Sequence, residues 1–239
     1  MGSVHAARQS KPPEDLNENA LLSLLTPKTI FVSSGSYTGD LVSEAYQLGD
    51  FAGTDGLLAA DYICQHLADG AGLKGTYRAV LSSTTQNANA RISTSLGPYR
   101  LVTGTPVAEN YAALFGTSDG TDASTPDLPP KWLISSVVVT ELGDSLEGPG
   151  SPTSRRVWTG SQANGALGPP VAGPPGSGFE GEFTTCEDWT SDASEVECED
   201  FNDVGVCGVT GQSLDASPLW LNTAREGCDN FRRLYCAEQ

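Results

Sequence analysis

The sequence predicts an α+β domain that is held together by disulfide bonds. Short runs of β-branched and aromatic residues between turn residues indicate strands, and one amphipathic stretch indicates a helix. Five of the six cysteines lie between Cys186 and Cys236, whereas Cys64 stands alone far upstream. A bridge from Cys64 to this cluster would close most of the chain into one loop. We therefore expect a small antiparallel sheet, one or two helices and long loops held by three disulfides.

The composition favours a loop-rich fold. The 239 residues include 27 Gly and 15 Pro, and only 38% are hydrophobic and 18% charged, which is below the average for globular domains. A chain of this length can bury a core, and covalent staples stabilise a core that carries many loops.

The charge is strongly acidic, with a formal net charge of −17. Between Glu180 and Asp203 there are ten Asp or Glu residues and no Lys or Arg. Such a surface repels phosphate backbones and anionic membranes, so nucleic acid and anionic lipid are not expected as partners. Cations, basic proteins or a saline medium suit it better.

The N-terminal residues 1–28 are polar and aperiodic, and we expect a flexible tail there, followed by one domain over residues 29–239. Residues 29–33 (TIFVS) predict the first strand. Residues 34–53 are rich in Gly and predict a loop.

A helix is predicted over residues 55–69, with Thr54 or Asp55 as its N-cap. His66 lies off the apolar stripe of this helix and is expected on the surface. The stripe places Cys64 on the buried face, because apolar residues recur at steps of three, four and three: Leu57, Ala60, Cys64 and Leu67.

The middle of the chain predicts further strands at residues 76–81, 98–102 and 132–140, and a short helix at 109–115. Residues 143–181 are mostly loop-like and rich in Gly and Pro, apart from a short stretch beginning at Arg156. Such a segment could be an interdomain linker. If Cys64 pairs with the C-terminal cluster, it is instead an excursion within one domain.

An even number of cysteines fits an oxidising compartment and an extracellular or cell-surface location. The alternatives are free thiols or metal ligands. No C-x2-C pair includes Cys64, Cys186 or Cys228, and only His5 and His66 could add imidazole, so a zinc site is not expected. The spacing leaves the disulfide pairing open.

No targeting signal or membrane span is predicted. The apolar stretch at residues 20–25 is too short for the core of a signal peptide, so we expect a mature form or another export route. No apolar run reaches the length of a membrane span, and no Asn-x-Ser/Thr glycosylation acceptor occurs.

Short motifs occur along the chain in an order that resembles a known family. They are IFVSSGSYTGDL (30–41), ADYICQ (60–65), GTYRA (75–79), GPY (97–99), VWTG (157–160), CEDWTS (186–191) and RLYC (233–236). The ordered set resembles the endostatin-like branch of the C-type-lectin-like fold, especially surface-protein domains known from Leptospira lipoproteins. The resemblance covers about residues 29–239.

This resemblance implies nested disulfides, with the first cysteine bonded to the last. Carried over to this sequence, it implies the pairs Cys64–Cys236 and Cys186–Cys228, which leaves Cys198–Cys207 as a local closure. We expect a structural role for all six, because no Cys-x-x-Cys redox motif is present.

The resemblance also makes sugar and calcium candidate ligands. Calcium-dependent lectins of this fold use Glu-Pro-Asn or Gln-Pro-Asp followed by Trp-Asn-Asp, and this chain has none of these triplets. We expect the large rings of Trp158, Trp189 and Trp220 to fill the core. The alternative is a ligand platform, for which Trp189, Trp220 and Asn222 are the candidates.

Calcium is the candidate cofactor, and the acidic residues near Cys198 are its candidate ligands, because hard cations prefer several carboxylate oxygens. The four candidates are Glu197, Glu199, Asp200 and Asp203. The alternative is a solvated acidic loop, since no EF-hand spacing occurs. A weaker candidate at residues 118–122 is read as a polar turn.

Two ligands of endostatin itself are not expected. Its zinc site uses histidines near the N-terminus, and with only His5 and His66 in this chain that site is not carried over. Its heparin binding uses an arginine patch, whereas Arg155-Arg156 and Arg232-Arg233 are expected to pair with acidic loops.

The chain is not expected to be an enzyme. No Gly-x-Ser-x-Gly motif occurs, and neither histidine lies near a plausible serine nucleophile. We expect a binding or adhesion module whose loops between residues 143 and 203 contact a protein or glycan. The alternative is a structural subunit of an extracellular appendage, whose N-terminal tail packs on a neighbouring subunit. Hydrolysis by a carboxylate pair is the third reading.

Overall fold

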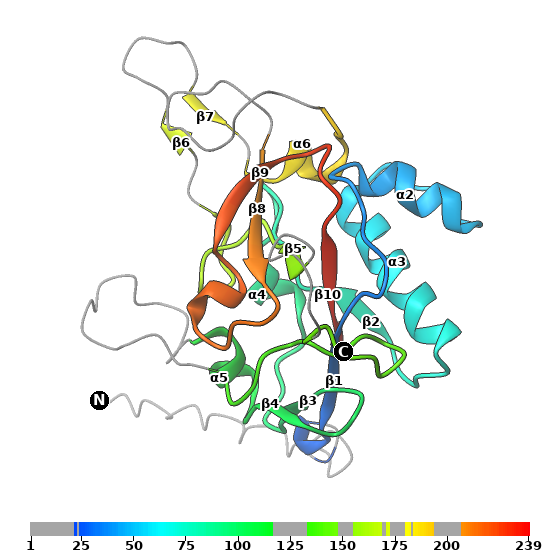
Figure 1. The fold of residues 1–239 in the computed structure, drawn as a ribbon, viewed down its shortest axis with the longest axis vertical. Helices are drawn as coiled ribbons and strands as arrows, with labels where there is room; N and C mark the ends of the chain where they lie inside the picture. Colours follow the sequence, from blue (N-terminus) through cyan, green and yellow to red (C-terminus); the bar gives the residue numbers. More distant parts are fainter. Residues whose placement is uncertain are drawn as a thin grey trace, which may run out of the picture.

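The fold shown in Figure 1 is that of a computed structural model, which describes residues 22, 24–116, 133–147, 155–168, 171–172, 180–182, 184–193 and 207–239. Within these residues the domain is a mixed α/β structure built on one sheet with the order β4-β3-β1-β10-β5-β8-β9, and β2 also pairs with β10. The strands of this sheet are β1 (Lys28–Val32), β2 (Tyr77–Ala79), β3 (Tyr99–Arg100), β4 (Pro106–Ala108), β5 (Arg156–Trp158), β8 (Cys207–Gln212), β9 (Ala224–Gly227) and β10 (Arg233–Glu238). A separate pair joins β6 (Val171–Ala172) to β7 (Glu180–Glu182). The helices are α2 (Leu41–Leu48), α3 (Gly56–Gly70), α4 (Ala88–Arg91), α5 (Tyr111–Phe115), α6 (Cys186–Trp189) and the 3-10 turn η2 (Pro218–Trp220).

The first and last strands lie together at the centre of the sheet. β1 runs antiparallel to β10, with Ile30 opposite Ala237 and Val32 opposite Tyr235. β10 is parallel to β5, and β1 is parallel to β3, so the sheet is mixed rather than wholly antiparallel as expected. Two parallel neighbours must be joined by a long connection. Long segments of the chain separate β1 from β3 and β5 from β10. The predicted excursion at residues 143–181 therefore contributes a central strand.

Both faces of the central strands are buried, and successive residues point to opposite faces. Ile30 and Val32 face a core that also contains Phe115 of α5 and Tyr235 of β10. Phe31 faces the opposite core, beneath α2 and α3. Figure 1 shows these two helices side by side on one flank of the sheet.

The predicted helix at 55–69 is found as α3, one residue later. Asp55 is its N-cap, because the carboxylate accepts a hydrogen bond from the Leu58 amide at 2.9 Å. Cys64 is fully buried and His66 is exposed, as the apolar stripe predicted.

The prediction of a loop over residues 34–53 is wrong, because this segment contains α2. Asp40 caps the helix by accepting from the Ser43 amide at 3.0 Å. Leu41 and Ala45, one turn apart, are fully buried against the neighbouring helix. Glycines flank this helix and its apolar face is only two turns long, so the sequence pattern did not indicate a helix.

The prediction of a strand over residues 132–140 is also wrong where the structure describes it, from Leu133 onward. Val137, Val138 and Val139 are buried, but the backbone bonds to several elements in turn. The Val32 amide donates to Val139 O, and the Ile134 amide donates to Val107 O. β-branched residues indicate a half-buried surface rather than a strand as such. Here the residues are buried, but they form no continuous set of strand–strand hydrogen bonds.

The predicted tail ends earlier than residue 28. Lys28 already belongs to β1, and Leu24 O accepts hydrogen bonds from the Leu96 and Gly97 amides at 2.9 Å each. Residues 1–21 lie outside the described part of the chain.

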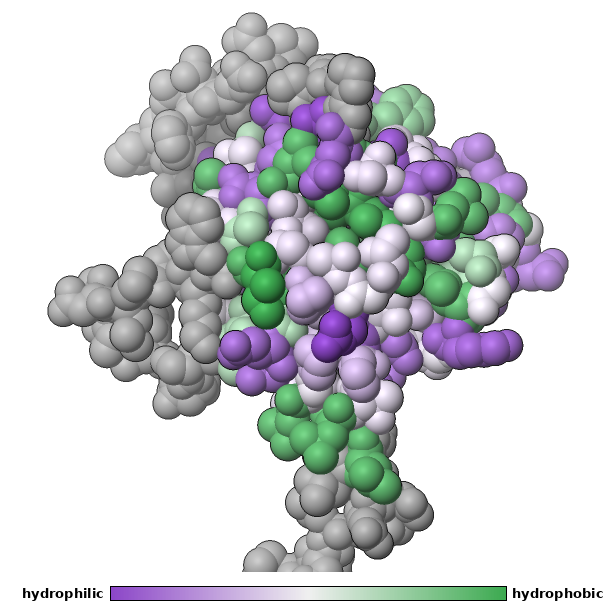
Figure 2. Space-filling view, turned by 60° about the horizontal axis from the view of Figure 1, so that its bottom comes forward, coloured by the Kyte–Doolittle hydropathy of each residue, from purple (hydrophilic) through white to green (hydrophobic). Residues whose placement is uncertain are grey.

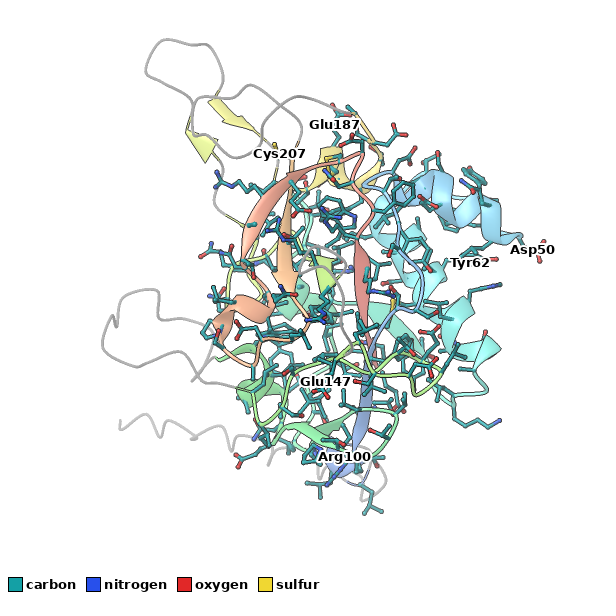
Figure 3. All side chains as sticks on the ribbon, viewed as in Figure 1. Asp50, Tyr62, Arg100, Glu147, Glu187 and Cys207 are labelled. Carbon is teal, nitrogen blue, oxygen red and sulfur yellow. A yellow bond between two sulfur atoms is a disulfide. The ribbon has the colours of Figure 1, made fainter. Side chains whose placement is uncertain are left out.

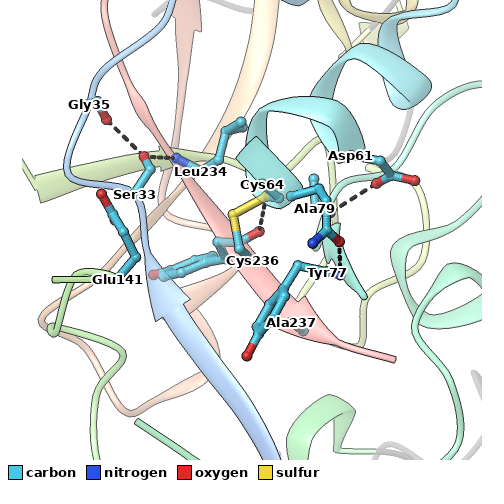
Figure 4. The surroundings of a disulfide bond; sticks show 12 residues. Ser33, Gly35, Asp61, Cys64, Tyr77, Ala79, Glu141, Leu234, Cys236 and Ala237 are labelled. Carbon is cyan, nitrogen blue, oxygen red and sulfur yellow. Dashed lines mark hydrogen bonds between the residues drawn. A yellow bond between two sulfur atoms is a disulfide. The ribbon is translucent and has the colours of Figure 1, made fainter. Parts of the chain in front are cut away.

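Two disulfides close the domain, and they are the two pairs that the resemblance implies. Cys64–Cys236 joins α3 to β10 across 172 residues, and Cys186–Cys228 spans 42. Figure 4 shows the first bridge between the helix and the strand. Cys207 is also disulfide-bonded, while its expected partner Cys198 lies outside the described residues.

A buried ion pair fixes α3 to the edge of the sheet beside this bridge. The Asp61 carboxylate accepts from the Ala79 amide at 2.9 Å and from Arg91 Nη2 at 2.6 Å. The Arg91 side chain is only 3% exposed and also donates to the carbonyl oxygen of Leu81. Burial raises the pKa of Asp61, and the positive charge of Arg91 opposes that shift.

Candidate functional site

The most unusual backbone in the described structure is the turn of α6. Its four residues, Cys186 to Trp189, all have positive φ, with values of 47°, 53°, 56° and 68°. This is a left-handed turn of residues that carry a Cβ, for which the left-handed region is unfavourable. Such strain persists only where the surroundings impose it, and it is concentrated at functional sites.

Three contacts hold this left-handed turn in place. The disulfide ties Cys186 to Cys228, and the Trp189 indole Nε1 donates to Ser82 O at 2.7 Å. The turn also lies directly on the first residue of α3. A Cβ at Gly56 would overlap the carbonyl oxygen of Asp188, so only glycine permits this approach.

The Asp188 side chain joins the turn to the segment that follows β2. Its carboxylate accepts hydrogen bonds from the Thr84 amide at 2.7 Å, from the Thr84 hydroxyl, and from the Thr185 hydroxyl at 3.1 Å. The neighbouring Glu187 is exposed, and Figure 3 places it at the end of the molecule where the turn lies.

A pocket of about 220 Å³ opens between the left-handed turn and the N-terminus of α3. Its lining is mostly hydroxyl and carboxylate side chains, together with one glycine and one leucine: Thr54, Asp55, Gly56, Leu57, Ser83, Thr85, Asp188 and Thr190.

The chemistry of this pocket is that of polar recognition. Hydroxyls donate and accept, whereas the carboxylates of Asp55 and Asp188 only accept when ionised, and they already bind backbone amides of the protein. The Thr190 hydroxyl donates to Glu187 O at 2.7 Å and the Thr85 hydroxyl is hydrogen-bonded to Ser83 Oγ at 3.1 Å. A bound group would therefore chiefly donate to the remaining lone pairs of these two hydroxyls and exchange hydrogen bonds with Thr54.

The candidate ligand platform of tryptophans is contradicted by burial. Trp189 is fully buried, and Trp220 is 2% exposed between the rings of Phe115 and Tyr235. Neither indole offers a face to a ligand, and the expectation that these rings fill the core is confirmed. Asn222 is exposed, but the Trp220 ring that would form a platform with it is buried.

The four candidate calcium ligands, Glu197, Glu199, Asp200 and Asp203, lie outside the described residues, as does the segment 118–122. Within the described ranges, no group of three or more His, Cys, Asp or Glu side chains is arranged to hold a metal ion.

The arginine doublets contact the protein in ways that the sequence only partly indicated. Arg156 and Arg232 both form ion pairs with Glu226, a buried residue of β9 rather than of the acidic loops. Arg233 donates to the carbonyl oxygens of Ser33 and Ser34.

Sequence reasoning found the N-cap of α3 but missed the rest of the pocket. The polar run Ser82-Ser83-Thr84-Thr85 after the predicted second strand was its only local signal. The left-handed turn has no signal of its own, because none of its residues is Gly or Asn.

In the described parts of the chain, no helix has both the length and the apolar character needed to cross a bilayer. Comparison with family models finds no match for this sequence, and comparison with curated proteins finds none either.

Proposed function

We propose that this chain is a non-enzymatic binding or adhesion module of the extracellular space or the cell surface, with a C-type-lectin-like, endostatin-like fold. The nested disulfides Cys64–Cys236 and Cys186–Cys228 support the fold, because the resemblance implies the same pairs. The disulfides also support the location, since such bonds persist in oxidising compartments.

The observation that carries the binding function is the left-handed turn at Cys186–Trp189 beside its pocket. A disulfide holds the turn in its strained shape before any ligand arrives, so a ligand does not have to order it. The ligand is a protein or glycan that places a polar group among the hydroxyls of the pocket. Residues 143–203 are proposed to contribute to the same contact surface.

Blocking the pocket tests this proposal. The wild-type chain is screened against immobilised glycans and extracellular-matrix proteins, and each binder is then measured with two variants. Thr85→Trp places a large ring at the exposed rim of the pocket, and Thr103→Trp places the same ring on an exposed turn elsewhere. We expect Thr85→Trp to abolish binding and Thr103→Trp to preserve it. Equal binding by both variants contradicts the pocket, and a screen without binders contradicts the module.

We propose that calcium binds to the protein, with four carboxylates as its ligands: Glu197, Glu199, Asp200 and Asp203. A ligand that binds the folded state raises the melting temperature, so a calcium titration of thermal stability with a magnesium control tests the site. A melting temperature that does not change with calcium leaves these residues as a charged surface.

The alternative is a structural subunit that assembles through its N-terminal segment. Leu22, Leu25 and Leu96 are 59%, 49% and 55% exposed, and the Leu96 amide donates to Leu24 O at 2.9 Å, which brings the two segments together. Figure 2 shows a hydrophobic patch at the lower end of the view. Sedimentation would detect oligomers that Leu25→Asp disrupts and that Leu142→Asp, at another exposed leucine, leaves intact. A monomer at all concentrations contradicts this alternative.

A further inference from the structure

A row of four aromatic rings lies on the outer surface of α2 and α3, and the functions considered above leave it unexplained. The aromatic row consists of Tyr46, Phe51, Tyr62 and His66. Successive ring centroids are 5.7, 5.4 and 6.1 Å apart, so each ring touches the next. Tyr62 and His66 are one turn apart on α3, and Tyr46 belongs to α2.

The aromatic row is accessible and held in place. Tyr46 is 48% exposed and His66 is exposed, while Phe51 and Tyr62 are half-buried. The Tyr46 hydroxyl donates to Gly53 O at 3.0 Å, which ties the connection between the helices to the ring. Leu58, one turn before Tyr62, is 58% exposed and adds apolar surface. A contiguous patch of exposed aromatic and apolar side chains indicates an interaction surface, whereas single exposed apolar residues do not.

The two helices that carry the aromatic row are acidic, and the first basic residue after them is Lys74. Residues 41–73 contain five Asp or Glu residues and no Lys or Arg. Three of these acids, Asp50, Asp55 and Asp69, are exposed. Asp50 directly precedes Phe51 of the aromatic row in the chain, and Figure 3 labels it just beyond the end of α2. The surface therefore combines carboxylates with the negative faces of aromatic rings, and both attract cations.

We propose that the aromatic row binds a lysine- or arginine-rich peptide segment of a partner protein. A guanidinium or ammonium group would lie over the Tyr46 and Tyr62 rings, and Asp50 would supply a carboxylate at the end of the row. The ring planes favour this occupant over a sugar, because neighbouring rings from Tyr46 to Tyr62 are tilted by 67° and 47°, and within the row the stacked arrangement is confined to Tyr62 and His66, at 29°. This inference does not rest on the pocket.

A labelled oligoarginine peptide tests the proposal, with an oligocitrulline peptide of equal length as its neutral counterpart. Because any polycation is drawn to a chain of net charge −17, the decisive variants keep the charge and change only the ring. Tyr62→Leu removes the aromatic face and Tyr62→Phe keeps it. Phe231→Leu is the matched control, since Phe231 is 61% exposed on another part of the surface.

Fluorescence anisotropy at low ionic strength is the measurement. We expect oligoarginine to bind and oligocitrulline not to bind. Tyr62→Leu lowers the affinity about two- to fivefold, and Tyr46→Leu/Tyr62→Leu lowers it about five- to thirtyfold where the two effects add. Tyr62→Phe and Phe231→Leu retain wild-type affinity. Circular dichroism and melting temperature establish that each variant is folded.

Three results overturn the proposal. Equal affinity of wild type and the double leucine variant shows that only net charge attracts the peptide. Equal binding of oligocitrulline removes the cation from the interaction. Binding of a neutral glycan that Tyr62→Leu abolishes, without binding of oligoarginine, assigns the aromatic row to a sugar instead.

Discussion

Removing each described disulfide separately tests how connectivity stabilises this domain. The outer variant is Cys64→Ala/Cys236→Ala and the inner variant is Cys186→Ala/Cys228→Ala. All four cysteines are fully buried, so each variant loses the same two buried sulfur atoms. The burial terms therefore largely cancel when the two variants are compared, and the length of the closed loop remains as the difference.

The closed loops span 172 and 42 residues. In the chain-entropy relation, these lengths correspond to about 5 and about 4 kcal/mol of stabilisation, so the outer variant loses about 1 kcal/mol more. The inner bridge already shortens the outer loop in the unfolded chain, but the logarithm changes little and the difference stays about 1 kcal/mol. Release of the strained turn at Cys186 reduces the cost of the inner variant and acts in the same direction.

Urea unfolding of both variants and the wild type measures these free energies. The comparison requires similar m values, because a change in m reports a change in the compactness of the unfolded state. An outer variant that is as stable as the inner one, at equal m, would falsify the loop-entropy reasoning. It would also place the main stabilisation of the inner bridge in the native state.

Two further predictions concern buried polar groups. Burial, followed by the charges of Glu141 and Glu44, raises the pKa of Tyr37 from 10.0 to about 12. The folded state therefore keeps this proton while the unfolded state releases it, so stability falls as pH rises above 10, by about 2 kcal/mol between pH 10 and 12 and by about 3 kcal/mol once both states are ionised. Tyr37→Phe should lose less stability over that range, and an unchanged pH profile contradicts this. Asp61→Ala leaves the buried Arg91 without its carboxylate and should cost about 3–5 kcal/mol in urea unfolding, whereas Asp69→Ala on the exposed face should cost little. Equal losses in the two variants would show that the Asp61–Arg91 pair is not stabilising.

Elements with strong local signals could be predicted from the sequence. The first strand carries a β-branched and aromatic run, and α3 combines an N-cap at Asp55 with an apolar stripe through Cys64. By contrast, α2 has a short apolar face between glycines. Its existence depends on packing against α3, which no local window contains.

The parts of the surface that we connect with function were hidden for a related reason. The pocket joins Thr54 and Asp55 to Thr85 and Thr190, which are far apart in the sequence. The aromatic row brings Tyr46 and Phe51 beside Tyr62 through the packing of two helices. Such juxtapositions are set by long-range contacts, so residue periodicity carries no signal for them.

The sequence by itself determined the net negative charge, the helix at α3 and the separation of Cys64 from the C-terminal cysteines, because these are properties of composition and local pattern. Only the tertiary structure decided the mixed pairing of the sheet, in which β1 is parallel to β3 and β10 is parallel to β5, and the presence of α2. The left-handed turn at Cys186–Trp189 was decided in the same way. Its residues do not favour positive φ on their own, and a disulfide, a buried indole and the absence of a Cβ at Gly56 together hold the backbone there.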